Sequence, residues 1–179
     1  MIDNCDLRLV SASLSPPPQL RELLVELGDG ESGFMGTPFG RGEMTLDEYL
    51  QSCCDGSDPA KIKPQSVPQT VFWLLDESGT AIGMVRVRHC LNENLLRSGG
   101  HIAYFIRASW RGKGYGKMAL RLALKELRKI GEKRALITVD SQNIPSIRTV
   151  QACGGELEDI IERASGGKTM RFWVDLAAE

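Results

Sequence analysis

The sequence predicts a single α/β domain of the α+β type over residues 1–179, in which helices flank a mixed, mostly antiparallel sheet. Two strand-like runs on either side of a turn at Asp76–Gly79 predict antiparallel hairpin pairing. An amphipathic helix between two later runs predicts one right-handed β-α-β crossover. These patterns together indicate strands of both orientations in one layered domain.

The first third of the chain holds one predicted strand and two predicted helices. The strand alternates polar and apolar side chains, the first helix follows three prolines, and the second begins with an N-cap threonine. These elements cover residues 6–11, 19–27 and 45–53. The glycine-rich segment 28–42 carries Phe34, Met35 and Phe39, which predicts either a connector or a lid.

From residue 70 onward the chain has the pattern of a sheet. Short runs rich in branched and aromatic residues alternate with turns, and two helical segments interrupt them. The predicted strands cover residues 71–75, 81–89, 102–106, 134–140, 156–162 and 169–176, and the helices cover residues 117–130 and 143–153.

The composition is that of a globular protein with a formal net charge of −1. No apolar run has the length of a membrane span, and the first residues lack the pattern of a signal peptide. Five cysteines at irregular spacing favour neither a disulfide framework nor a metal site. We therefore expect a cytoplasmic protein with no membrane partner and no metal.

Positive charge is concentrated in one segment. Residues 111–134 hold nine basic and two acidic side chains, whereas the rest of the chain holds thirteen basic and twenty-one acidic ones. Lys113, Lys117 and Arg121 lie nearest the start of the predicted crossover helix and are the better candidates for phosphate binding. Because the acidic remainder would repel a long polyanion, we expect a small anionic ligand and no nucleic acid.

The turn between the strand 102–106 and the crossover helix predicts a phosphate cradle. Its three alternate glycines lack β-carbons, so backbone N–H groups can converge on an anion. The helix that follows contributes unpaired N–H groups and a partial positive charge. The candidate binding residues are Arg111, Gly112, Lys113, Gly114, Tyr115, Gly116 and Lys117.

Two common nucleotide motifs fit this turn poorly. A P-loop needs four residues between its first glycine and Gly-Lys-Ser/Thr, and here three residues separate Gly112 from Gly116 and Met118 takes the last place. A dinucleotide fingerprint needs a third glycine at Lys117, although Asp140 lies near the distance expected for its acidic residue. The dinucleotide interpretation is weakened but stays open.

The turn resembles, in every position, the Arg/Gln-x-x-Gly-x-Gly/Ala motif of the GNAT N-acetyltransferases. About thirty residues later, Asn143-x-x-Ser146 followed by Gly154-Gly155 resembles the family's second motif. The predicted order of strands and helices is also the GNAT order. The segments Arg88-His89-x-Leu91-Asn92 and Gly99-Gly100-His101-Ile102 are similar to a bacterial branch of these acetyltransferases.

The resemblance implies a six- to seven-stranded sheet with splayed central strands and acetyl-coenzyme A as cosubstrate. Backbone groups of Phe105, Ile106 and Arg107 would then pair with the pantetheine arm, and the Ile106 N–H would serve as the oxyanion donor. Asn143 would bind the pantetheine or a water, cap the following helix, or do both. Ser146 is expected at the start of that helix and is, with Asn143, a candidate coenzyme-binding residue.

The family's usual proton donor is absent from the corresponding position. Many members have a tyrosine seven residues after the asparagine, where this sequence has Val150. Tyr104 and His101 are the remaining candidates for steering amine deprotonation through water. His89 and His101 flank one loop and would be cross-strand neighbours in a symmetric hairpin, but two histidines do not make a metal site.

The sequence thus predicts an acetyl-coenzyme A-dependent N-acetyltransferase that acts on a primary amine of a small molecule or peptide. Residues 29–42 are expected to form one wall of the acceptor site. The first alternative is a non-catalytic acyl-coenzyme A sensor, and a dinucleotide-binding reductase is a more distant one. The sequence leaves open the acceptor, the acyl preference and the oligomeric state, including a homodimer.

Overall fold

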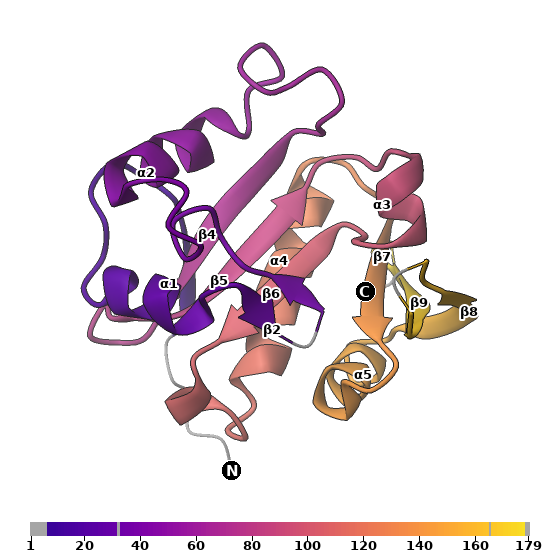
Figure 1. The fold of residues 1–179 in the computed structure, drawn as a ribbon. Helices are drawn as coiled ribbons and strands as arrows, with labels where there is room; N and C mark the ends of the chain where they lie inside the picture. The colour runs from indigo at the N-terminus through magenta and orange to yellow at the C-terminus, as the bar shows by residue number, and fades with distance from the viewer. Residues whose placement is uncertain (1–6, 32, 165, 178–179) are drawn as a thin grey trace.

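The computed structural model describes residues 7–31, 33–164 and 166–177 of the chain (Figure 1). The elements in chain order are β1 (Arg8–Ser11), α1 (Leu20–Leu27), β2 (Gly30–Glu31), β3 (Phe34–Met35), α2 (Leu46–Asp55), β4 (Gln69–Leu75), β5 (Ala81–Arg88), α3 (Glu93–Arg97), β6 (Ile102–Ile106), the 3-10 helix η1 (Ala108–Trp110), α4 (Tyr115–Lys129), β7 (Arg134–Asp140), α5 (Ile144–Gln151), β8 (Glu156–Glu162) and β9 (Lys168–Asp175). The predicted fold class is confirmed.

The strands form two larger antiparallel sheets and one short hairpin. The first sheet has the order β1-β4-β5-β6, the second has the order β7-β9-β8, and β2 pairs only with β3. In the described part of the chain β6 and β7 share no ladder, so the seven longer strands divide into two sheets at the point where the central strands were expected to splay. Figure 1 shows these two strands side by side near α3 and farther apart toward α5.

The two sheets are joined where β6 begins. The His101 N–H donates to the Leu136 carbonyl at 2.7 Å, and the Leu136 N–H donates to Nδ1 of His101 at 2.9 Å. One residue earlier, Gly100 has a φ of 58° and lies so close to the Leu136 carbonyl that no β-carbon would fit. These contacts hold the strands together at one end only.

Two apolar clusters cover opposite faces of the first sheet. On one face, α4 and Val150 of α5 pack against side chains such as Val85 and Ile106. On the other face, α1 and α2 cover Met84 and Phe105. The alternation of neighbouring strand residues between the two clusters is the period of two expected for a sheet buried on both sides.

Several local predictions are confirmed and others need correction. Thr45 caps α2 in a capping box with Glu48, and β8 and β9 form the expected terminal hairpin. Helix α4 begins at Tyr115, two residues earlier than predicted, because Gly114 is its N-cap. The β2–β3 hairpin and α3 were not predicted. No helix among the described residues has the length and apolar character needed to cross a membrane.

The buried His101 ring predicts an acid-sensitive fold. Burial and the nearby charge of Arg88 lower the pKa of His101 from 6.5 to about 4. Between pH 6.5 and 4 the unfolded chain binds more protons, so stability is lost as the pH falls through this range. We expect a loss of about 3 kcal/mol in the free energy of unfolding, measured by urea denaturation.

The variant His101→Asn is the matched control for this pH dependence. Its Oδ1 can accept the Leu136 N–H in place of Nδ1, but the side chain does not titrate. The slope of stability against pH between 6.5 and 4 should be smaller than in the original chain. An unchanged slope in this variant would assign the acid sensitivity to other groups.

Candidate active site

The turn before α4 has the backbone geometry of an anion cradle. Gly112 and Gly114 have φ values of 76° and 80°, a region that strains residues with a β-carbon. Gly114 is the N-cap of this 15-residue helix and supplies no side-chain cap, and the N–H groups at the start of a helix lack carbonyl partners four residues earlier, which suits an anion. Residues 111–114 are exposed, and a ligand can reach them from solvent.

Positive side chains surround the start of α4. Lys113 lies over the ring of Trp110, with its Nζ 5.5 Å from the ring centroid. Burial raises the pKa of the Cys153 thiol. The positive charges of Arg121 and Lys117 partly oppose this rise, so both side chains lie near Cys153. The basic residues of α4 therefore face the end of α5 as well as solvent, and they leave the cradle rich in positive charge.

The backbone of β6 shows which groups a ligand could pair with. The Arg107 N–H donates to the Ile82 carbonyl at 3.0 Å, and the Arg88 N–H donates to the His101 carbonyl at 2.8 Å. Because hydrogen bonds alternate along an antiparallel pair, Phe105 also bonds toward β5, whereas Ile106 points away from it. The expectation of free backbone groups at Phe105 and of a free Arg107 N–H is wrong, and Ile106, like Tyr104, has an outward-facing backbone.

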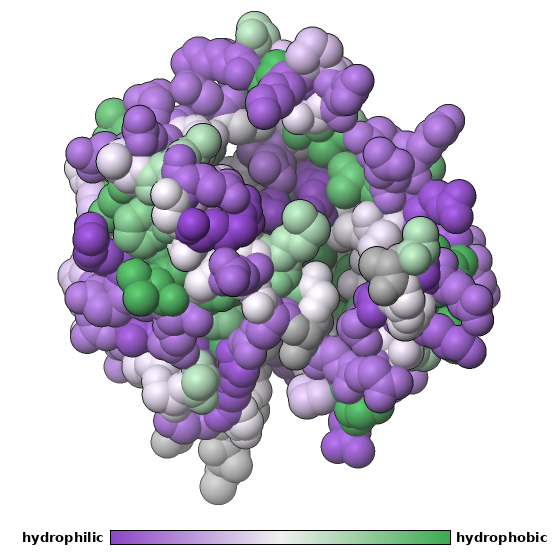
Figure 2. Space-filling model, in the orientation of Figure 1, coloured by the Kyte–Doolittle hydropathy of each residue, from purple (hydrophilic) through white to green (hydrophobic). Residues whose placement is uncertain are grey.

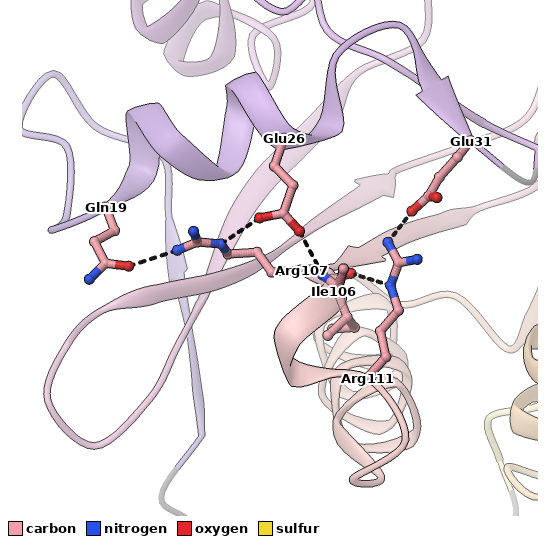
Figure 3. A network of polar contacts seen from close by, with 7 residues as sticks. Gln19, Glu26, Glu31, Ile106, Arg107 and Arg111 are labelled. Carbon is pink, nitrogen blue, oxygen red and sulfur yellow. Dashed lines mark hydrogen bonds and ion pairs between the residues drawn. The ribbon is translucent and has the colours of Figure 1, made fainter.

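Arg111 lies across this outward edge of β6. Its Nε donates to the Ile106 carbonyl at 2.8 Å, and its guanidinium pairs with Glu31 of β2 (Figure 3). The same guanidinium lies 5.3 Å from the centroid of the Phe105 ring. A ligand that uses the Ile106 carbonyl must first displace Arg111.

Arg107 belongs to a structural network rather than to the cradle. Its Nε and a second nitrogen donate to Glu26 and Gln19 of the α1 region, at 2.9 and 2.7 Å, and Glu26 also accepts the Ala108 N–H at 2.6 Å (Figure 3). Burial raises the pKa of Glu26, but the hydrogen bonds from Ala108 and Arg107 outweigh it and lower the pKa. This network fixes the turn after β6 against α1.

Tyr104, Ser146 and Asn143 lie on the α4–α5 side of β6. The Tyr104 hydroxyl and Ser146 Oγ are 3.0 Å apart, and Asn143 Oδ1 accepts the Ser146 N–H at 3.1 Å. Asn143 is thus the N-cap of α5, which confirms helix capping as one of its two expected roles. A β-carbon at Gly116 would lie 3.5 Å from the Tyr104 ring, so Tyr104 borders the start of α4.

The two histidines lie away from the cradle, and their rings contact different partners rather than each other. His101 is opposite Arg88 rather than His89, and its Nδ1 is occupied by Leu136. The Nε2 of His89 lies 2.8 Å from Oγ1 of Thr70. The expectation that His89 and His101 face each other is wrong, and His101 marks the junction of the sheets at the end of β6 opposite the cradle.

Val150 takes the place of the family's tyrosine and is fully buried. It packs in the cluster beneath α4, and Gly155 lies directly against its side chain, with no room for a β-carbon. The described part of α5 therefore presents no phenol at this position. Any proton donor for a leaving group has to come from another element or from water.

The β2–β3 hairpin spans the front of the open edge. Phe34 packs against Phe105 with ring centroids 6.1 Å apart, and a β-carbon at Gly33 would lie 3.5 Å from the Asp140 side chain at the end of β7. The hairpin thus touches both sheets. Met35 is 75% exposed, so only part of the predicted apolar loop packs inward. Glycine content was the only sequence signal for this element.

The sequence model of the acetyltransferase (GNAT) family matches residues 42–154, which include the cradle, β6 and α5. The chain belongs to the acetyltransferase (GNAT) family. This finding confirms the predicted family and the enzyme class of the N-acetyltransferases. Among curated proteins, the comparison found no match.

Solved GNAT structures share the fold at low sequence identity. The ribosomal L7/L12 α-N-protein acetyltransferase RimL, in complex with coenzyme A, has a TM-score of 0.72 at 13% identity, covering 100% of this chain and 98% of that one. The microcin C7 self-immunity acetyltransferase MccE, with acetyl-CoA and AMP, has a TM-score of 0.69 at 15% identity, covering 97% and 94%. A chimera of the Vibrio cholerae spermidine N-acetyltransferase SpeG has 0.64 at 16%, covering 96% of each.

The left-handed backbone of the cradle predicts that Gly114→Val weakens coenzyme binding. The β-carbon strains the turn and its methyl groups enter the space before α4, so the affinity for acetyl-coenzyme A should fall by about 2 kcal/mol. Isothermal titration calorimetry measures this change. The exposed Gly131, with a φ of 94° and open space around it, provides the matched Gly131→Val control, which should bind normally. Equal binding by both folded variants would contradict the assignment.

Proposed function

We propose that this chain transfers an acetyl group from acetyl-coenzyme A to a primary amine of a small molecule or peptide. The observation that carries the proposal is that the cradle and the outward-facing backbone of Ile106 lie at the same end of β6. A pyrophosphate could bind in the cradle, and an arm with amide groups could hydrogen bond to the backbone of Ile106. The GNAT structures with bound coenzyme A or acetyl-CoA support this choice of cosubstrate.

The chemistry needs little from side chains. The neutral amine attacks the thioester carbon, a C–N bond forms, the C–S bond breaks, and the coenzyme leaves as a thiolate while the amine loses a proton. Negative charge develops on the thioester oxygen, and the Ile106 N–H would donate a hydrogen bond to it. Alignment of the amine with the thioester accounts for most of the rate enhancement in this proposal.

Proton removal from the amine is proposed to run through water. Burial raises the pKa of Tyr104, and hydrogen bonds with Ser146 and Thr149 only partly oppose this rise. The phenol therefore stays protonated near neutral pH and cannot act as a base. His101 is held at the junction of the sheets. Neither side chain is therefore proposed as the general base, and Tyr104 is proposed to position Ser146 and the start of α5.

We further propose that the β2–β3 hairpin forms a wall of the acceptor site. Phe34 contacts Phe105, which is adjacent to Ile106 and lies on the opposite face of β6 from Tyr104. The coenzyme would reach Ile106 from the cradle beside α4, and the acceptor would approach from the face that α1, α2 and the hairpin surround. The two substrates would thus meet at the open edge from opposite sides.

Thioester consumption with a panel of amines tests the proposal. We expect at least one primary amine to accelerate coenzyme A release from acetyl-coenzyme A, with a rate that rises along a single limb as pH increases. The variant Tyr104→Phe should keep this pH profile. Tight binding of acetyl-coenzyme A without acceleration by any amine would favour the acyl-coenzyme A sensor, and preferential binding of NADP would favour the reductase.

A further inference from the structure

Two arginines lie side by side on the acceptor face of β5. Side chains of a strand alternate between faces, so Arg86 and Arg88 share the face of Met84, which α1 and α2 cover. Across the ladder to β6, Arg86 is opposite Ala103 and Arg88 is opposite His101. Ala103 is small and partly exposed, so space remains above the middle of β6.

Arg86 is held in place without an ion-pair partner. Its guanidinium lies 5.6 Å from the centroid of the Phe34 ring, and its Nε is buried with no hydrogen-bond partner. Its charge opposes the rise in pKa that burial causes in Tyr49 and Cys53, and a side-chain hydrogen bond between Arg86 and Tyr49 acts in the same direction. None of the ion pairs among the described residues includes Arg86, so no carboxylate directly neutralises its positive charge there.

Arg88 adds a second positive charge beside it. One of its nitrogens donates to the carbonyl oxygens of Gly99 and Gly100, at 2.9 and 2.8 Å. Burial and the charge of Arg86 lower the pKa of Arg88 to about 10, so Arg88 remains charged at neutral pH. Two neighbouring cations removed from water are costly unless an anion joins them.

Arg86, Arg88 and Ala103 are each partly exposed, so a ligand can reach this face of the sheet from solvent. Figure 2 shows this face hollowed between the region of α2 and the β2–β3 hairpin and the region of α3, with hydrophilic residues in the hollow. Along β6, Ala103 precedes Ile106 by three residues, a separation of roughly 10 Å at about 3.3 Å per residue. The cation pair and the proposed reaction point thus lie within the length of a small molecule.

We infer that Arg86 and Arg88 bind an oxyanion group of the acceptor, which is therefore a small primary amine that also carries a carboxylate or phosphate several bonds from its nitrogen. The inference rests on the proposed acetyl transfer and names the class of its acceptor. The planar guanidinium of Arg86, stacked on Phe34, would present paired N–H groups to the anion. A polyamine acceptor would instead be repelled by the pair.

A series of acceptors with one chain length tests this inference. The compounds are 6-aminohexanoate, 6-aminohexyl phosphate, hexylamine and 1,6-diaminohexane, which share the amine and differ at the far end. We expect kcat/KM for at least one of the two anionic amines to exceed that for hexylamine by about 10- to 100-fold, with the diamine lowest. The better of the two identifies carboxylate or phosphate as the recognised group. Equal values across the series, or a preference for the diamine, would overturn the inference.

Matched variants assign the preference to Arg86. Arg86→Gln should remove most of it, Arg86→Lys should retain part of it, and Arg97→Gln, which removes an exposed charge on α3, should leave it intact. Unchanged affinity for coenzyme A in Arg86→Gln shows that the variant is folded. A loss of activity that is equal for anionic and neutral amines would contradict a role for Arg86 in anion recognition.

Calorimetry separates this inference from the proposed function. In the presence of coenzyme A, the preferred anionic amine should bind to the original chain and to Arg97→Gln but at least 10-fold more weakly to Arg86→Gln. This binding pattern without turnover of any amine would reject acetyl transfer and keep the anion site. Turnover with no dependence on Arg86 would reject the anion site and keep acetyl transfer.

Discussion

The central constraint on this fold is that β6 has a partner strand on one side only. Its N–H and C=O groups alternate in direction, so those of Phe105 and the Arg107 N–H bond toward β5, whereas those of Ile106 face a gap that β7 does not fill. Unpaired backbone groups inside a protein are costly and need partners. The elements around the gap either supply hydrogen-bond partners to the outward-facing backbone of β6 or leave it accessible to a ligand.

Arg111 supplies the hydrogen-bond partner of the Ile106 carbonyl in this structure. The same guanidinium pairs with Glu31 on the β2–β3 hairpin, so one side chain links the open edge, the hairpin and the cradle. A pyrophosphate in the cradle would compete with Glu31 for the charge of Arg111. Occupation of the cradle and release of the Ile106 carbonyl are therefore coupled in this account.

The cradle could be predicted from the sequence because its geometry is local. Gly112 and Gly114 adopt positive φ values in a turn of a few residues, and the amphipathic pattern that follows is sufficient to identify α4. The N-cap role of Asn143 was likewise readable, since it depends only on the residue three positions later.

The errors arise where register decides the outcome. Whether Arg107 or Ile106 faces the gap, and whether His101 is opposite Arg88 or His89, changes with a shift of one residue between β5 and β6. The sequence pattern does not specify that shift. The neighbouring cations Arg86 and Arg88 were missed for a related reason, because which side chains surround them depends on the elements that cover that face of the sheet.

Amide hydrogen exchange at single residues of β6 tests the central claim most directly. Saturation with coenzyme A should slow exchange of the Ile106 amide by at least about 10-fold more than that of Phe105 and Arg107, which already bond toward β5. Such a difference would show that the ligand pairs with the open edge. Binding that leaves the Ile106 amide no more protected than its two neighbours would contradict the account.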